Sequence, residues 1–231
     1  VLADTSKTVR DALAKDTHPE AKRAYQAADA ARSANKRQKA LAAYAVYVAY
    51  GQELRFGADP EVSARASVLL EELASENVKE VRNLDLARAA HAAATRSPAA
   101  RGMLEAMVST RPNDIDVLSL LGETELRARE PQAASAAWEK AEVVEKSART
   151  AYGLARAKFL AGDRKQAEEL ATLTLTRNPS HVGARILTAR ATWNHGKEAQ
   201  ATKLLEEVTA DTAGSSSGEL VEAHTLLGEV H

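Results

Sequence analysis

The chain has 231 residues, of which 45% are hydrophobic, so it is long enough to bury a core as one or two domains. Its 31 Lys and Arg residues are matched by 32 Asp and Glu residues, and the formal net charge of -1 excludes nucleic-acid binding through bulk positive charge. Cysteine is absent, which excludes disulfides, thiolate metal ligands and cysteine nucleophiles and leaves the redox compartment open.

The composition favours helices. Aromatic residues make up only 4% of the chain, and 11 glycines and 6 prolines are few, as in helices packed closely through small side chains. The longest uncharged apolar run, Ala40 to Tyr50, is shorter than the roughly 20 residues that cross a membrane and predicts a buried helix. The start at Val1, without an initiator Met, predicts a fragment or a processed product. Localisation therefore stays open between the cytoplasm and the periplasm or another extracytoplasmic compartment.

Residues 1–76 are predicted to form helices with a weaker version of the repeat found further along the chain. An extra helix expected over Pro60 to Ala74 leaves the pairing of helices in this region open. One stretch of apolar and aromatic side chains has two interpretations. Core packing is the favoured one, and an exposed docking or dimerisation face is the other. Its residues are Leu41, Tyr44, Val46, Tyr47, Val48, Tyr50, Leu54 and Phe56.

A pattern recurs about every 34 residues between residues 77 and 213. Its units are 81–114, 115–147, 148–181 and 182–213, and each predicts two helices joined by a short turn. In the second unit Asn113 and Asp114 cap the first helix, and Pro131 occupies the first position of the second helix. One face of that second helix carries three apolar residues at i, i+4 and i+7, namely Ala134, Trp138 and Ala141.

The other units repeat this plan. Their helices are expected at Val81–Thr95, Pro98–Thr110, Ala148–Leu160, Gln166–Arg177 and His181–Asn194, with glycine turns at Gly162 and Gly196. The apolar face recurs as Ala100, Leu104 and Met107, as Ala167, Ala171 and Thr174, and as Ala201, Leu205 and Val208. Residues 214–218 predict a Gly/Ser insertion, and 219–231 predict the first helix of a further or capping repeat.

These units resemble the tetratricopeptide repeat (TPR) family, whose pattern matches Leu121–Gly122, Ala134, Trp138, Ala141 and Pro112 here. Two departures are Arg88 in the glycine position of its unit and Thr188–Ala189 in place of Leu–Gly. The resemblance implies an all-α fold in which helix-turn-helix repeats stack as a right-handed superhelical solenoid. It also implies that the first helix of each pair lines a concave groove.

No motif for catalysis is evident. The sequence shows no glycine-rich phosphate loop after a strand, and its histidines lie at no recognisable zinc spacing, so we expect no cofactor, no metal and no enzyme activity. These histidines are His18, His91, His181, His195, His224 and His231.

By the resemblance, groove positions fall on the second, fifth, ninth and twelfth residues of each unit. This predicts a partner-binding strip of Arg149, Tyr152, Arg156, Phe159, Ile186, Arg190 and Trp193, with Gly183 at the remaining position. Acidic residues bound it, among them Glu123 and Glu222. Guanidinium groups beside aromatic rings suit an acidic peptide with an apolar anchor. The alternative is that the arginines are solvated surface charges and the large apolar residues pack in the core.

The function expected from the sequence is a non-catalytic scaffold that binds a partner protein or peptide through the concave groove. The alternative is a regulatory or substrate-recruiting helical-repeat domain of a larger enzyme. Nucleic acid and membrane insertion are not expected, and oligomerisation is left open.

Overall fold

A computed structural model describes residues 81–210 and 217–230, together with isolated positions between 43 and 71. Every regular element in these described ranges is an α-helix. The helices are α6 (Val81–Ala94), α7 (Ala99–Thr110), α8 (Ile115–Ala128), α9 (Pro131–Val144), α10 (Ala148–Leu160), α11 (Arg164–Arg177), α12 (Val182–Asn194), α13 (Glu198–Ala210) and α14 (Ser217–Val230). Most of the region predicted at 1–76, including its helix pairing, lies outside the described residues.

Local sequence explains where the central helices begin and end. Asp114 caps α8 by accepting hydrogen bonds from the backbone N–H groups of Asp116 and Val117, and Pro131 opens α9. Ser147 and Thr150 form a reciprocal capping box at the start of α10. The starts at Asp114 and Pro131 agree with those expected from the sequence, and the capping box is an additional finding of the structure.

Two predicted helix starts differ from the structure by two residues, and other boundaries differ by one. Helix α11 begins at Arg164 rather than Gln166, because the carboxylate of Asp163 accepts a hydrogen bond from the Gln166 backbone and caps the helix earlier. Helix α14 begins at Ser217 rather than Glu219, so it takes in the last two residues assigned to the Gly/Ser insertion. Gly162 and Gly196 have positive φ angles of 86° and 73°, as their predicted turns require.

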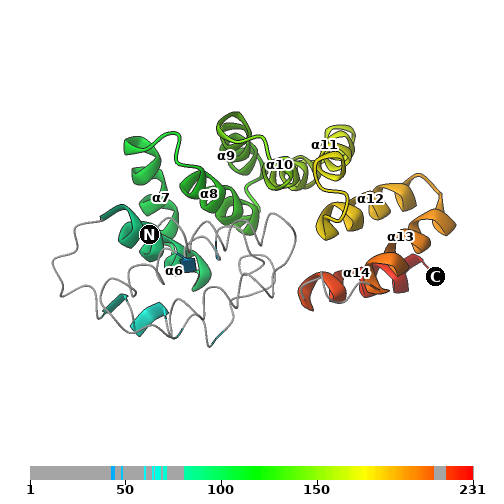
Figure 1. Ribbon diagram of the computed structural model, residues 1–231, viewed down its shortest axis with the longest axis horizontal. Helices are drawn as coiled ribbons and strands as arrows, with labels where there is room; N and C mark the ends of the chain where they lie inside the picture. The colour runs from blue at the N-terminus through cyan, green and yellow to red at the C-terminus, as the bar shows by residue number, and fades with distance from the viewer. Residues whose placement is uncertain are drawn as a thin grey trace.

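The helices stack in antiparallel pairs. The most extensive packing is within pairs α8–α9, α10–α11 and α12–α13, and each pair then packs on the next through α9–α10, α11–α12 and α13–α14. In Figure 1, α9 and α11 lie along the upper edge of the stack, with α8, α10 and α12 below them. This arrangement confirms the predicted all-α fold of TPR-like repeats stacked as a solenoid.

The core follows the predicted apolar face. Ala134, Trp138 and Ala141 are completely buried, and each equivalent residue in the other second helices is buried as well. Among the described residues the core divides into four clusters, each joining neighbouring helices. The core is therefore a series of interfaces along the stack.

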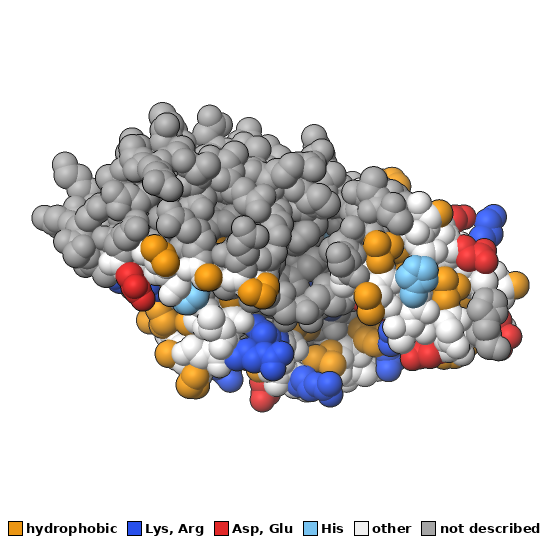
Figure 2. All heavy atoms as spheres, turned by 90° about the horizontal axis from the view of Figure 1, so that it is seen from below, with side chains coloured by type: hydrophobic (Ala, Val, Ile, Leu, Met, Phe, Trp, Pro, Cys, Tyr) orange, Lys and Arg blue, Asp and Glu red, His pale blue; other side chains and the backbone are white. Residues whose placement is uncertain are grey.

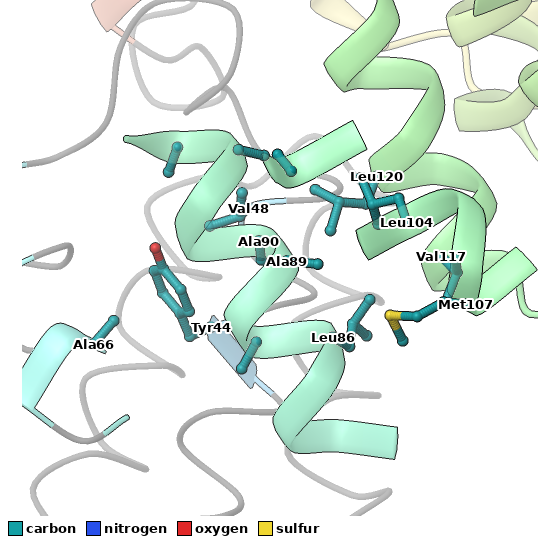
Figure 3. Close-up of a cluster of buried hydrophobic side chains, with 14 of the residues drawn as sticks. Tyr44, Val48, Ala66, Leu86, Ala89, Ala90, Leu104, Met107, Val117 and Leu120 are labelled. Carbon is teal, nitrogen blue, oxygen red and sulfur yellow. The ribbon is translucent and has the colours of Figure 1, made fainter. Parts of the chain in front are cut away.

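The first of these clusters includes residues from the N-terminal stretch whose fate was left open. Tyr44, Val48 and Ala66 are buried against Leu86 and neighbouring residues of α6, α7 and α8, as Figure 3 shows. Core packing is thus confirmed for Tyr44 and Val48. The other members of that stretch, Leu41, Val46, Tyr47, Tyr50, Leu54 and Phe56, lie outside the described residues. Among the described helices, none has the length and apolar character needed to cross a bilayer.

Candidate functional site

A pocket of about 220 Å³ lies between first helices of successive repeats. Helix α8 packs on α10, and α12 packs on α14. Helices α10 and α12 are further apart, and the pocket lies in the space between them. Its apolar wall is formed by Leu126, Phe159, Leu160 and Leu187. Its remaining lining residues are Tyr152, Arg156, Gly183, Arg190 and Glu222.

The structure brings four of the predicted groove residues together in this pocket: Tyr152, Arg156, Phe159 and Arg190. Ile186 is a correction, because its side chain is 1% exposed and packs in the core cluster of α12, α13 and α14. Trp193 packs against the same cluster and is half-buried, and neither it nor Arg149 lines the pocket. The helical position alone therefore did not separate groove contacts from packing residues.

Arg156 is held by an acidic residue of the preceding repeat. Its Nη1 donates hydrogen bonds to both carboxylate oxygens of Glu123, at 2.7 and 2.9 Å, and Glu123 is only 4% exposed. The Arg156 guanidinium also lies 5.6 Å from the centre of the Tyr152 ring. The positive charge of Arg156 is therefore balanced inside the fold.

Arg190 has a looser partner. Its Nη2 lies 3.7 Å from Oε1 of Glu222 on α14, which is beyond hydrogen-bond distance, and its side chain is 35% exposed. Its guanidinium lies 6.0 Å from the centre of the Phe159 ring, and the guanidinium of Arg164 covers that ring at 3.8 Å. Of the two pocket arginines, Arg190 is thus the more exposed and the more loosely paired.

Tyr152 bridges the gap between α10 and α12. Its ring centre lies 4.5 Å from that of His181, whose Nδ1 caps α12 by accepting from the Ala184 backbone. A Cβ atom at Gly183 would lie 2.3 Å from the Tyr152 hydroxyl, so only glycine at this position lets the tyrosine lie across α12. Gly183 therefore determines the shape of the pocket.

Helix α8 contributes less open surface than its predicted groove positions suggest. Asp116, Ser119 and Glu123 are 3%, 0% and 4% exposed, and Asp116 accepts a 2.9 Å hydrogen bond from Arg82. Leu160 and Leu187 were not predicted as groove residues. The signal that could have found them is that each lies one helical turn from a predicted groove position on the same helix. Within the described ranges, no cluster of His, Asp and Glu suited to a metal ion is found.

The fold is similar to that of two solved structures described as MamA. One, described as MamA AMB-1, is 16% identical with a TM-score of 0.51, and the match covers 77% of this chain and 94% of that one. The other is 17% identical with a TM-score of 0.49, covering 62% of this chain and 91% of that one. No family model matches the chain, and no curated protein matches its sequence. At this level of identity the likeness concerns the fold, a TPR-type helical repeat.

Proposed function

We propose that this chain is a non-catalytic interaction scaffold that holds a segment of a partner protein in the pocket between α10 and α12. The observation that carries the proposal is an open apolar wall where the first helices α10 and α12 are spaced apart. Leu160 in this wall is 42% exposed, and the same pocket is lined by Phe159, Leu187 and several polar side chains. Mixed surfaces of this kind, with an apolar centre and a polar rim, are typical of protein interfaces.

Two features favour binding over catalysis. The pocket volume of about 220 Å³ is below the roughly 300–1,000 Å³ of sites that enclose small-molecule ligands or cofactors. Its lining residues include one carboxylate, Glu222, which faces Arg190, and one hydroxyl, on Tyr152, which lies against Gly183. A single carboxylate and a single phenol are not the residue types typical of a nucleophile activated by a base.

The same pocket would serve the alternative, a substrate-recruiting domain of a larger enzyme. The sequence of the full-length gene product separates the two, because an enzyme would show catalytic domains beside the repeats. The scaffold function does not depend on the acidic partner expected from the sequence, because Glu123 and Glu222 already face the pocket arginines.

A matched pair of variants tests the scaffold function. Leu160→Lys places a charge on the pocket wall, whereas Leu173→Lys makes the same change at a leucine of α11 that is 36% exposed and does not line the pocket. We expect proteins captured from the source cells by the wild type to be lost with Leu160→Lys and retained with Leu173→Lys, as quantified by mass spectrometry. Equal capture by all three proteins would place the binding surface elsewhere.

A further inference from the structure

We propose that Arg96 and Arg127, at the ends of α6 and α8, form a second binding surface of this chain, which takes a carboxylate from an acidic segment of a partner protein. Neither arginine lines the pocket between α10 and α12. The proposal therefore goes beyond the pocket and does not depend on it.

The backbone at Arg96 is the first observation. The turns that end α6, α8, α10 and α12 share one hydrogen-bond pattern, in which the N–H of residue 96, 129, 162 or 196 donates to the carbonyl three residues earlier. Glycine occupies the last two of these positions, whereas Arg96 and Arg129 both have a φ of 61°. A side chain in this left-handed region is strained and glycine is not. Because the chain uses glycine at two equivalent turns, we infer a role for the arginine side chain itself.

The second observation is that Arg127 reaches the same turn from the next repeat. Its Nη1 donates to the backbone oxygen of Ala93 at 2.8 Å, and the backbone N–H of Arg96 donates to that same oxygen at 3.1 Å. Arg127 is half-buried and Arg96 is exposed. Within the described residues, Nε and Nη2 of Arg127 make no hydrogen bond, so a guanidinium with fixed position keeps donors for a ligand.

The charges of these two arginines are not neutralised. Burial lowers the pKa of Arg127, and the positive charge of Arg96 lowers it further. No carboxylate of the described residues is within ion-pair distance of either guanidinium, whereas Arg82 and Arg101 in the same two repeats each have one. The negative end of the α6 dipole balances only about half an elementary charge.

The neighbouring charged side chains leave this excess in place. Glu130, in the turn after α8, acts on the pKa values of Arg101 and Glu125 and is not among the groups that shift Arg127. Arg129, the residue equivalent to Arg96 in the next turn, is exposed and adds a further positive charge to this edge of the stack. An anion is therefore the ligand that this edge favours.

A carboxylate side chain is the anion that fits best. Planar guanidinium groups hold a carboxylate through paired hydrogen bonds. A nucleic acid needs a row of phosphate contacts, and over the described part of the face in Figure 2 basic side chains are interspersed with acidic and hydrophobic ones. The pair is thus suited to one or two Asp or Glu residues of a partner segment.

The experiment measures the fluorescence polarisation of labelled octapeptides mixed with the 231-residue chain in about 0.1 M salt. One peptide repeats Ser-Glu, and the uncharged control repeats Ser-Gln. We expect the Ser-Glu peptide to bind and the Ser-Gln peptide not to bind. Arg96→Gly and Arg127→Gln should each weaken binding of the Ser-Glu peptide by about tenfold, because each removes charge-assisted hydrogen bonds.

Arg96→Gly also separates binding from folding. Because glycine relieves the strained φ angle, this variant should have a Tm about 2–4 °C higher than the wild type while it binds the peptide less well. Arg129→Gly is the matched control, with the same φ angle and the same loss of charge one repeat away. It should raise Tm similarly and change the affinity by less than about twofold. An Arg96→Gly protein that binds as tightly as the wild type would overturn the proposal.

Two comparisons separate this surface from other sites. Leu160→Lys should bind the Ser-Glu peptide like the wild type, and a loss with Leu160→Lys but not with Arg96→Gly would place the peptide in the pocket, overturning this surface and leaving the scaffold function standing. A phosphoserine-Gln repeat that binds at least tenfold more tightly than Ser-Glu, and still depends on Arg96, would assign the site to phosphate and overturn the carboxylate. Absence of Ser-Glu binding would also overturn the proposal. Circular dichroism verifies that each variant is folded.

Discussion

Two glycines in the central repeats make room for the largest buried side chain. Trp138 on α9 is completely buried, and a Cβ at Gly122 on α8 or at Gly153 on α10 would lie 2.5 or 2.4 Å from its ring. The indole therefore lies between the first helices of two successive repeats. Its Nε1 makes no hydrogen bond in the described structure, so shape and burial account for its contribution.

We expect opposite effects from the same substitution at two helical glycines. Gly153→Ala should lower the free energy of unfolding by about 1–3 kcal/mol, because the new methyl group overlaps the buried Trp138 ring. Gly102→Ala on α7 should raise it by about 0.5–1 kcal/mol, since a Cβ there meets no atom within 4 Å and alanine is the better helix former. Urea denaturation measures both. Stabilisation by both substitutions would mean that Trp138 shifts freely.

Glu125 is expected to make stability depend on pH. Its side chain on α8 is 2% exposed and its Oε2 makes no hydrogen bond in the described structure, although Oε1 lies 3.1 Å from Nε of Arg101. Burial raises the pKa of Glu125 above its ordinary value of 4.5, Arg101 opposes this, and the charges of Glu105 and Glu130 add to it. The folded state thus favours the protonated form. Protonated Glu125 therefore contributes fully to the stability of the fold below pH 4.5, and this contribution is lost as the pH rises through the raised pKa.

Glu125→Gln copies the protonated form and should therefore raise Tm at neutral pH, with a gain that shrinks as the pH falls towards 4.5. Thermal melts across this pH range provide the measurement. Glu169→Gln is the control, because this side chain is exposed on α11 and its charge is not among those that shift the pKa of Glu125. A gain of the same size at every pH would show that the effect of Glu125→Gln is not protonation.

At the scale of the helices, arginines join the repeats α6–α7, α8–α9 and α10–α11 to one another. Arg82 donates to Asp114, Arg156 to Glu123 and Arg177 to Glu142, over separations of 32, 33 and 35 residues. Burial alone would raise the pKa of Asp114, but hydrogen bonds and the charge of Arg82 lower it. Opposite charges one repeat length apart thus meet where successive units pack. Because charge-assisted hydrogen bonds require a specific geometry, these pairs restrict how successive repeats can pack more than apolar contacts do.

Arg177, the last residue of α11, links this helix to the preceding repeat. Its guanidinium donates to both oxygens of Glu142, at 3.1 and 2.6 Å, and to the backbone oxygen of Ser147 at 2.7 Å. Arg177→Gln should therefore lower the free energy of unfolding by about 1–3 kcal/mol, since partly buried acceptors lose a charged donor. Lys165→Gln on the exposed side of the same helix should change it by less than about 0.5 kcal/mol. Equal denaturation midpoints for the two variants would contradict a stabilising contact of Arg177 with Glu142 and Ser147.

The helix faces could be predicted because they depend on local spacing. Ala134, Trp138 and Ala141 lie on one face of a helix whatever surrounds it, and the predicted cap at Asp114 acts within a few residues. Whether a groove arginine is paired depends on the rotation between successive repeats, and this rotation cannot be read from the spacing of residues within one helix. That rotation brings Glu123 onto Arg156 and places Ile186 in the core. A search for opposite charges 32 to 35 residues apart would have indicated the first of these.

At the scale of the whole molecule, the division of the core into successive clusters predicts how the fold opens. The described stack is packed most extensively between α8 and α11, and less so where α6 meets α7 and where α13 meets α14. In a linear array each repeat is stabilised mainly by its neighbours, so the ends open more readily than the centre. We expect backbone amides of α8 to α11 to exchange most slowly with deuterium and those of α14 to exchange faster.

Trp138→Ala tests this coupling directly. Removing the buried indole should cost about 3–5 kcal/mol and leave a cavity between α8, α9 and α10. Hydrogen exchange followed by mass spectrometry should then accelerate in these three helices first. It should change less in α13 and α14, whose core cluster contains no residue of α8, α9 or α10. Leu205→Ala in that distant cluster is the converse control, with acceleration in α13 and α14 before α9. Equal acceleration in every helix for both variants would mean that the stack unfolds as one cooperative unit, in which each interface depends on all the others.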